Sequence, residues 1–340
     1  MTPARLGVGL AGLGTMGRNH LRNLVAREDV TLVAVADPLP VAQQAALQHA
    51  PGARAFADPF TLLAEERLDA LIVATPTTAH HDLALAAIER GVPVLIEKPL
   101  ARTVEEGLQL VRAAERAGVL LQVGHIERFN PAVEELGRRL AGGALSRIFS
   151  IKTVRGGPLP ERIRDVGVTV DLATHDVDII CHLAGERPMR AYAELTQHVH
   201  TDHEDLLYGL LAFPGGALGQ LDVNWLTPEK QRRITVLGEE GMFQVDYLSQ
   251  ALTFTRGARE LAPTFLDGYA PTFAGETVQL PVQAAEPLRR ELDAFFGAIR
   301  DGGPPAISGA DGLWAVALAL ALLRSATEHR PLDITPLEVS

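Results

Sequence analysis

The chain has 340 residues, 47% of them hydrophobic, so it is long enough to bury a full core and to form two domains. Its formal net charge of -11, from 31 basic and 42 acidic residues, argues against nucleic acid or an anionic membrane as a partner. The single cysteine, Cys181, excludes an intramolecular disulfide and a cysteine-rich zinc site. The first apolar strand begins at Leu6 and the longest apolar run, 313–323, is too short to span a bilayer, so we expect a cytoplasmic protein without a signal peptide.

The first third of the chain alternates short apolar segments with segments that carry apolar residues at helical spacing. Strands are expected at 6–10, 31–36, 70–74, 93–96 and 120–123. Helices are expected at 19–27, 41–49, 79–90 and 104–117. This alternation predicts right-handed crossovers and a mainly parallel, doubly wound sheet that binds its ligand at the carboxyl ends of the strands.

A glycine-rich turn joins the first of these strands to the first helix. Gly12 allows a tight turn, Gly14 lets the backbone approach a pyrophosphate, and Gly17 lets the helix lie close to the strand. The unpaired N–H groups and partial positive charge at the amino end of the helix favour a bound phosphate. We therefore expect a dinucleotide here, with Thr15 and Met16 also in contact with it.

An acidic residue, Asp37, closes the second strand twenty residues after Gly17. Its carboxylate is suited to accept the hydroxyls of an adenosine ribose and would repel a 2′-phosphate. Neither lysine nor arginine occurs between Pro38 and Pro51, so this segment supplies no cation to neutralise such a phosphate. The cofactor predicted from these residues is NAD rather than NADP.

Short polar motifs follow two more strands of the same sheet. Because parallel strands present their carboxyl ends at one edge, we expect both motifs to contact the cofactor. Their residues are Thr75, Pro76, Glu97 and Lys98. His80, near the start of the following helix, is also expected to touch the cofactor, with capping of that helix as the alternative.

From about His125 the pattern changes to a connecting helix at 131–140 and then to strands separated by short turns. The strands are expected at 146–154, 191–198, 206–213, 217–225, 233–237, 242–247 and 251–255. This spacing predicts a large, mainly antiparallel open sheet. Helical patterns return at 287–300 and 310–327.

The fold class predicted is α/β, with three consecutive parts. Residues 1–123 form a Rossmann domain with a doubly wound parallel sheet, and residues 124–306 form an α+β domain with the open sheet. The apolar helix and tail of residues 307–340 are expected to pack between the two domains.

Asp171 and His175 stand four residues apart in a segment, 168–183, that has a helical pattern, so their side chains share a face. A carboxylate can orient a neighbouring imidazole and stabilise its charged form, which suits the pair to take the proton of a secondary alcohol. Lys98 would stabilise the developing alkoxide. The alternative for Asp171 and His175 is a purely structural pair.

A metal site is a rival interpretation of the same segment. His175, Asp178 and His182 follow one another at offsets of three and four residues and could converge on zinc. We favour a site without metal, because a base and a cation are already present for hydride transfer.

Four motifs occur together and in order: Gly12-Leu13-Gly14-Thr15-Met16-Gly17, Thr75-Pro76, Glu97-Lys98-Pro99 and Asp171-Leu172-Ala173-Thr174-His175. In these the chain resembles the Gfo/Idh/MocA oxidoreductase family over essentially its whole length. The resemblance implies that Lys98, Asp171 and His175 form the catalytic group. It further implies oxidation or reduction of sugar, inositol or sugar-nucleotide hydroxyls with NAD or NADP. A homodimer or homotetramer joined through the open sheet is implied as well.

Two longer stretches, 123–131 and 155–167, are similar to the nucleotide-sugar branch, which includes UDP-N-acetylglucosamine 3-dehydrogenases. The resemblance implies oxidation at C3 of a UDP-N-acetyl hexosamine and places His125 among the substrate-binding residues. Three arginines are candidates for bidentate contacts to the diphosphate, with ordinary surface ion pairs as the alternative. They are Arg155, Arg162 and Arg164.

Other functions remain open from the sequence. An inositol or simple sugar dehydrogenase would use the same residues on a free polyol. A reductase of unsaturated or imine substrates would not need the histidine base. A sensor that binds NAD without catalysis is the alternative of another class, although lysine, aspartate and histidine are all present.

Overall fold

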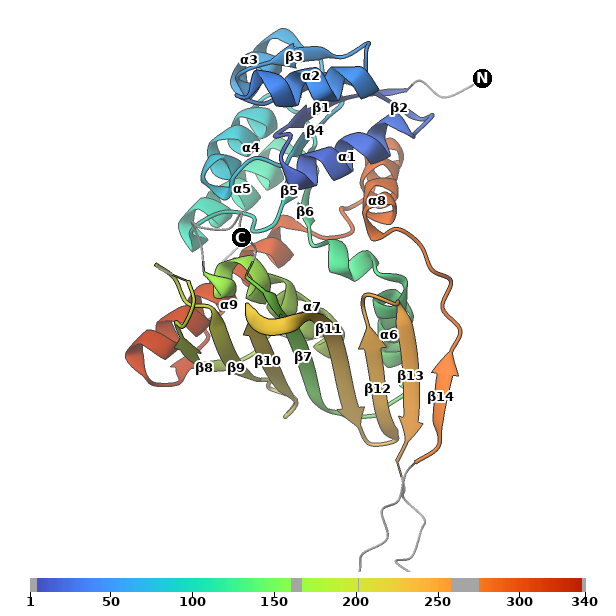
Figure 1. The fold of residues 1–340 in the computed structure, drawn as a ribbon, viewed down its shortest axis with the longest axis vertical. Helices are drawn as coiled ribbons and strands as arrows, with labels where there is room; N and C mark the ends of the chain where they lie inside the picture. Colours follow the sequence, from blue (N-terminus) through green and yellow to red (C-terminus); the bar gives the residue numbers. More distant parts are fainter. Residues whose placement is uncertain (1–4, 160–166, 201, 258–274, 338–340) are drawn as a thin grey trace, which may run out of the picture. The chain divides into compact units, whose positions relative to one another are not determined.

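The computed structural model describes residues 5–159, 167–200, 202–257 and 275–337 (Figure 1). The chain divides into two compact units. The first consists of Met1–Ile126, Glu286–Ala317 and Leu337–Ser340, and the second of Glu127–Ala285 and Leu318–Pro336. The predicted boundaries lie at 123 and 306, whereas the first unit of the structure runs to Ile126 and resumes at Glu286.

The first unit contains a six-stranded parallel sheet in the order β3-β2-β1-β4-β5-β6. Its strands are β1 (Leu6–Ala11), β2 (Val30–Ala36), β3 (Arg54–Phe56), β4 (Ala70–Val73), β5 (Val94–Glu97) and β6 (Leu121–Gly124). The order reverses between β1 and β4, and open sheets of this kind bind their ligands at such a switch point. The doubly wound parallel sheet is therefore confirmed, and β3 is the strand that the sequence pattern did not reveal.

Helices lie on both faces of this sheet (Figure 1). They are α1 (Thr15–Val25), α2 (Pro40–His49), α3 (Pro59–Glu65), α4 (His80–Glu89) and α5 (Val104–Ala117), with α8 (Pro287–Asp301) and the first part of α9 (Gly309–Glu328). Local chemistry sets several of their ends. Thr103 caps α5 by accepting the N–H of Glu106, and Gly118 ends it in the left-handed conformation at φ 63°.

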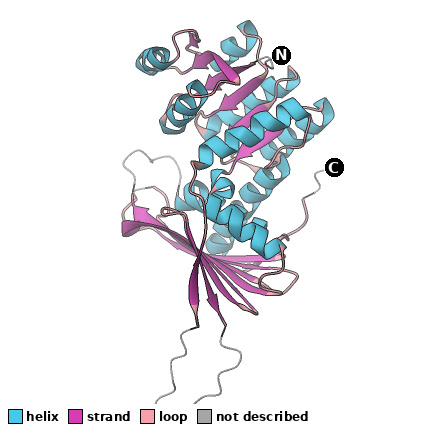
Figure 2. Ribbon diagram, turned by 90° about the vertical axis from the view of Figure 1, so that its right-hand side faces the viewer, coloured by secondary structure: helices cyan, strands magenta, loops and turns pink. Residues whose placement is uncertain are grey.

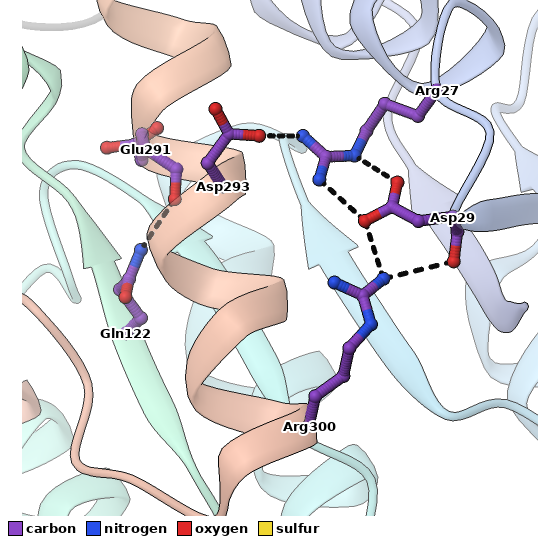
Figure 3. A network of polar contacts seen from close by, with 6 residues as sticks. All are labelled: Arg27, Asp29, Gln122, Glu291, Asp293 and Arg300. Carbon is purple, nitrogen blue, oxygen red and sulfur yellow. Dashed lines mark hydrogen bonds and ion pairs between the residues drawn. The ribbon is translucent and has the colours of Figure 1, made fainter. Parts of the chain in front are cut away.

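Helix α8 belongs to the core of the first unit. Its Leu288, Leu292, Phe295 and Phe296 are buried in the same cluster as apolar residues of β1, β2 and β4. A polar network joins the helix to the start of β2, where Arg27 pairs with both Asp29 and Asp293, and Arg300 also pairs with Asp29 (Figure 3).

The second unit contains a nine-stranded sheet in the order β14-β13-β12-β11-β7-β10-β9-β8-β15. Its strands are β7 (Ile148–Pro158), β8 (Arg190–Thr196), β9 (Leu206–Ala212), β10 (Leu218–Asn224), β11 (Leu226–Gly238), β12 (Gly241–Asp246), β13 (Ala251–Arg256), β14 (Thr277–Leu280) and β15 (Leu332–Asp333). All neighbours are antiparallel except β7 and β10. The predicted antiparallel sheet is thus confirmed, with two more strands than the pattern showed.

Helices α6 (Pro131–Ala141) and α7 (Thr174–Ala184) lie against one face of this sheet (Figure 2). Strand residues on that face, such as Ile151, Leu211 and Leu221, are fully buried. Alternate residues of the same strands point to the opposite face, which we call the outer face. It carries four large exposed apolar side chains: Tyr208, Leu210, Leu218 and Leu237.

By length and composition, α9 would be able to cross a membrane, which the shorter run at 313–323 did not indicate. Of the most apolar 18-residue stretch of this helix, 56% is buried inside the structure. A buried core helix of a protein can have the same length and composition, so α9 is weak evidence for a membrane span.

Candidate functional site

The glycine turn after β1 leaves no room for side chains at two positions. Gly12 has φ 90°, and a Cβ there would collide with the backbone of Ala74 at the end of β4. A Cβ on Gly17 would collide with the carbonyl of Gly12. Gly14 is exposed and open, and as the N-cap of α1 it places no side chain on the amino end of the helix. The first N–H groups of α1 therefore remain available to an anion.

Asp37 is held at the end of β2 by this turn. Its Oδ2 accepts the N–H of Leu13 at 2.8 Å and its Oδ1 accepts the N–H of Leu39 at 2.9 Å. Each carboxylate oxygen still has a lone pair for a further donor, such as a ribose hydroxyl. The carboxylate is therefore fixed in place and still able to bind.

A pocket of about 540 Å³ lies beside Asp37 between α1 and α2. Its wall is mostly apolar, with Leu21, Val25 and Ala46 among its residues, which suits a flat aromatic ring such as adenine. Arg18 and Arg22 of α1 also line it. Residues 38–51 contain no lysine or arginine, but these two arginines reach the pocket from another helix.

His80 connects the loops that follow β4 and β5. The imidazole is buried, its Nδ1 lies 2.9 Å from the carbonyl of Pro99, and its Nε2 lies 2.9 Å from the carbonyl of Thr75. Burial lowers the pKa of His80, although the two carbonyls oppose this effect. Both ring nitrogens are thus occupied by the protein, which differs from the predicted contact of His80 with the cofactor. Lys98, between Glu97 and Pro99, is partly exposed at the end of β5.

Glu97 turns into the first unit. Its Oε1 lies 2.7 Å from Nε2 of His20, and both residues are buried. Its other carboxylate oxygen occupies the space beside Gly124 of the neighbouring strand β6, where an added Cβ would lie 3.1 Å from it. The contacts of Glu97 with His20 and Gly124 therefore fix the start of the loop that carries Lys98. His125, which follows β6, is buried as well.

The segment with Asp171 and His175 is not one regular helix. Thr169–Ala173, labelled η3, forms a π-helical turn, and α7 begins at Thr174. Such turns are rare and are frequent at functional sites. From 171 to 181, Asp171 and His175 are the two residues with partial exposure, and every other residue is buried. The two predicted catalytic side chains are therefore the accessible ones of this stretch.

Arg155 lies in a buried ion-pair cluster, and its placement corrects the predicted contact with a diphosphate. Its Nε donates to Asp176 and its Nη1 to Glu127, each at 2.9 Å, and its guanidinium lies over the ring of Tyr247. Only 4% of its side chain is exposed. The sequence showed none of these partners, because they come from three distant segments. Arg162 and Arg164 lie outside the described residues.

Arg232, which the sequence analysis did not single out, faces Arg155 across the pairing of β11 with β7. Its Nη1 donates to the carbonyls of Gly156 at 2.6 Å and Gln231 at 2.7 Å. Burial and the charge of Arg155 lower the pKa of Arg232 to about 10. The charges of Asp176, Glu127 and Asp171 oppose this effect, so Arg232 lies in the electrostatic surroundings of the predicted catalytic residue Asp171.

The zinc interpretation is not supported by the geometry. In the parts of the chain that the structure describes, no group of three or more histidine, cysteine or acidic side chains is arranged to hold a metal ion. Asp178 is instead buried against Arg128, whose Nε donates to it at 2.8 Å, and His182 is exposed.

Two family models match this chain. One, described as the oxidoreductase family with an NAD-binding Rossmann fold, matches residues 6–125, and the GFO/IDH/MocA C-terminal domain matches residues 133–244. UDP-N-acetylglucosamine 3-dehydrogenase of Acidithiobacillus ferrooxidans is 31% identical, with 92% of this chain and 94% of that protein covered. Inositol 2-dehydrogenase 2 of Saccharopolyspora erythraea is 29% identical, with 97% of this chain and 96% of that protein covered.

Solved structures agree with this relationship. The crystallised UDP-N-acetylglucosamine 3-dehydrogenase GnnA of A. ferrooxidans has a TM-score of 0.84 and 25% identity, with 96% of this chain and 99% of that chain covered. A levoglucosan dehydrogenase in complex with NADH and L-sorbose has a TM-score of 0.86 and covers 98% of this chain, and at 23% identity it supports the fold alone. The chain therefore belongs to the Gfo/Idh/MocA family of oxidoreductases and is an NAD-dependent enzyme of that family.

Proposed function

We propose that this enzyme oxidises the C3 hydroxyl of a UDP-N-acetyl hexosamine with NAD, and that Lys98, Asp171 and His175 carry the reaction. The main observation is that Asp171 and His175 are the accessible residues of the stretch from 171 to 181. The substrate class is supported by the 31% identity with a UDP-N-acetylglucosamine 3-dehydrogenase over 92% of the chain.

The first unit has the features that NAD requires. The amino end of α1 is open for a pyrophosphate, Asp37 can accept ribose hydroxyls, and the apolar pocket beside it has room for adenine. NAD, when bound, accepts the hydride from the substrate carbon.

His175 takes the proton of the substrate hydroxyl as the carbon loses its hydride, so a secondary alcohol becomes a ketone and the imidazole becomes charged. Asp171, four residues earlier, orients the imidazole and stabilises its charged form. The ammonium group of Lys98 stabilises the negative charge that develops on the oxygen. In the reverse direction His175 returns the proton to the alkoxide.

The substrate is tested by adding UDP-N-acetyl sugars, inositols and simple aldoses to the enzyme with NAD and following reduced nicotinamide by absorbance. We expect a response with UDP-N-acetyl sugars. A response confined to inositols would favour the second candidate, an inositol dehydrogenase, which the 29% identity over 97% of the chain supports. Bound NAD without turnover of any of these compounds would favour a sensor.

Replacing His175 by alanine tests the proposed base. We expect turnover to fall roughly 100-fold or more, because general-base catalysis contributes at least that much, while the dissociation constant for NAD stays unchanged. His182→Ala is the matched control, since His182 is an exposed histidine of the same helix. Full turnover by the His175 variant would refute the assignment.

We also propose that the enzyme is a homodimer or homotetramer joined through the outer face. Tyr208, Leu210 and Leu218 lie on adjacent strands and are each at least half exposed. Contiguous apolar surface of this kind marks interaction sites. The net charge of -11 makes nucleic acid and anionic membranes poor partners. We also propose that the enzyme is cytoplasmic.

A further inference from the structure

The amino end of the catalytic segment is capped by a residue 35 positions later in the chain. Oε1 of Glu204 accepts the N–H of Thr169 at 3.1 Å, and the backbone carbonyl of Glu204 accepts the N–H of Val168 at 3.0 Å. The first N–H groups of a helix have no partner within it, and leaving such a group buried and unpaired is unfavourable. Val168 and Thr169 are both fully buried, and Glu204 supplies the acceptors for their N–H groups.

Gly167 makes room for this cap. A Cβ on Gly167 would collide with the carboxylate of Glu204. The carbonyl of the same glycine accepts the N–H of Asp171 at 3.1 Å. Gly167 therefore lies between the cap and the catalytic aspartate, in contact with both.

Glu204 is itself held in place by its neighbour Asp205. The buried carboxylate of Asp205 accepts N–H groups of the preceding residues, including His198 at 2.9 Å and His200 at 3.0 Å. The backbone of Asp205 bonds the end of β8 through Thr196 and the N–H of Trp225 after β10. These bonds fix the backbone beside Glu204, so its carbonyl is held in place as an acceptor for Val168.

We propose that Glu204 is a positioning residue for catalysis: by capping η3 it holds the π turn that presents Asp171 and His175 to the substrate. This inference rests on the proposed function of these two residues. The capping carboxylate does not touch substrate or cofactor in this proposal, and it acts through Val168, Thr169 and Gly167.

Three variants test the proposal through kinetics. Glu204→Ala removes the side-chain acceptor, and we expect kcat to fall about tenfold or more, while KM for NAD changes less than about twofold, because misplaced catalytic groups slow the chemical step. Glu204→Gln keeps an oxygen acceptor and should restore most of kcat. Glu186→Ala is the control, since Glu186 also accepts a backbone N–H, that of Gly215, and should leave kcat unchanged. Wild-type kcat in Glu204→Ala would overturn the proposal.

A double-mutant cycle tests the route of the effect. Gly167→Ala forces the Glu204 carboxylate out of its position, so its loss of kcat should resemble that of Glu204→Ala. The double variant should be no slower than the slower single variant, because both changes remove the same interaction. Fully additive losses would show that the two residues act independently and would overturn the proposal.

Hydrogen exchange tests the cap without relying on turnover. The amides of residues 168–175 should exchange faster in Glu204→Ala than in the wild type, and those of α6 should not change. Unchanged protection over 168–175 would overturn the proposal. If the wild-type enzyme turned over none of the tested substrates, the proposed function would fail, and hydrogen exchange would still report whether Glu204 holds the segment.

Discussion

Glu291 on α8 is a carboxylic acid in the interior of the first unit. It is fully buried, and neither of its side-chain oxygens has a hydrogen-bond partner among the residues that the structure describes. Its backbone carbonyl accepts a bond from Gln122 (Figure 3). Burial, together with the charge of Glu97, raises the pKa of Glu291 well above its ordinary value of 4.5. The side chain is therefore held as a neutral acid over a wide pH range.

Replacing Glu291 by glutamine should make the stability of the protein less sensitive to alkaline pH. An acid whose pKa is raised in the folded state contributes stability below its unfolded pKa, and this contribution is lost as pH rises above 4.5 toward the folded pKa. Thermal melts at constant protein concentration should show the variant more stable than the wild type at pH 8, with the difference shrinking toward pH 4.5. Glu115→Gln, on the exposed face of α5, is the control. A difference that did not vary with pH would contradict this explanation.

The environment of some single residues could be predicted from the sequence, and that of others could not. Gly12 and Gly17 could be predicted from the spacing of the glycine motif, although the backbone that crowds Gly12 belongs to Ala74 of a distant strand and only Gly17 is crowded by a near neighbour, Gly12. Arg155 could not, because its carboxylate partners Glu127 and Asp176 lie 28 and 21 residues away. An arginine in a polar stretch has the same sequence signature whether it binds a ligand or pairs inside the protein.

At the scale of elements, α8 is the clearest difference between expectation and structure. Its amphipathic pattern predicted a helix at 287–300, and a helix is present at Pro287–Asp301. The pattern did not show which core the apolar face would join. In the structure its phenylalanines are buried with β1, β2 and β4, so α8 stabilises the cofactor unit.

Phe295→Ala tests this assignment of α8. Phe295 is fully buried, so we expect the free energy of unfolding of the first unit to fall by about 3–5 kcal/mol. Urea denaturation, with hydrogen exchange of the β1 and β4 amides as the readout, would measure this loss of unfolding free energy. Phe60→Ala, at an exposed phenylalanine of the same unit, should cost about 1 kcal/mol or less. Equal losses in both variants would contradict the burial of α8 in this core.

The elements missed by the sequence analysis are short. Strand β3 has three residues and β15 has two, too few for a periodic pattern; strand β14, with four residues, and helix α3, with seven, were missed as well. The π turn η3 was also missed, because its apolar residues fit an ordinary helix. Glu204, which accepts the N–H of Thr169 at the start of η3, lies 35 residues further along the chain, so no local pattern contains this contact.

At the scale of the whole molecule, the outer face of the nine-stranded sheet is the surface on which the proposed oligomer depends. Its strands alternate buried residues toward α6 and α7 with exposed residues on the other side, where Tyr208, Leu210, Leu218 and Leu237 gather. An open sheet with such a face remains exposed to water unless another chain covers it. A second copy of this chain is the proposed partner.

Leu210→Arg should break the proposed oligomer. Leu210 lies on β9 between Tyr208 and Leu218 of the outer face, 50% exposed, and a two-fold interface through these residues would bring two such arginines into one apolar contact. Light scattering should show a shift to smaller species, with an unchanged circular dichroism spectrum. Leu248→Arg, in the turn after β12, is the control and should leave the mass unchanged. A Leu210 variant of unchanged mass would place the interface elsewhere.

The sequence by itself determined the parallel sheet, the glycine turn, Asp37 and the candidate catalytic residues, because each depends on spacing within one strand or helix or on a motif. Only the tertiary structure decided which residues beyond those segments complete the sites. Arg18 and Arg22 reach the pocket of Asp37, α8 closes the core of the first unit, and Glu204 caps η3. These contacts join residues far apart in the chain, and their partners are chosen by packing and by the need to pair buried polar groups.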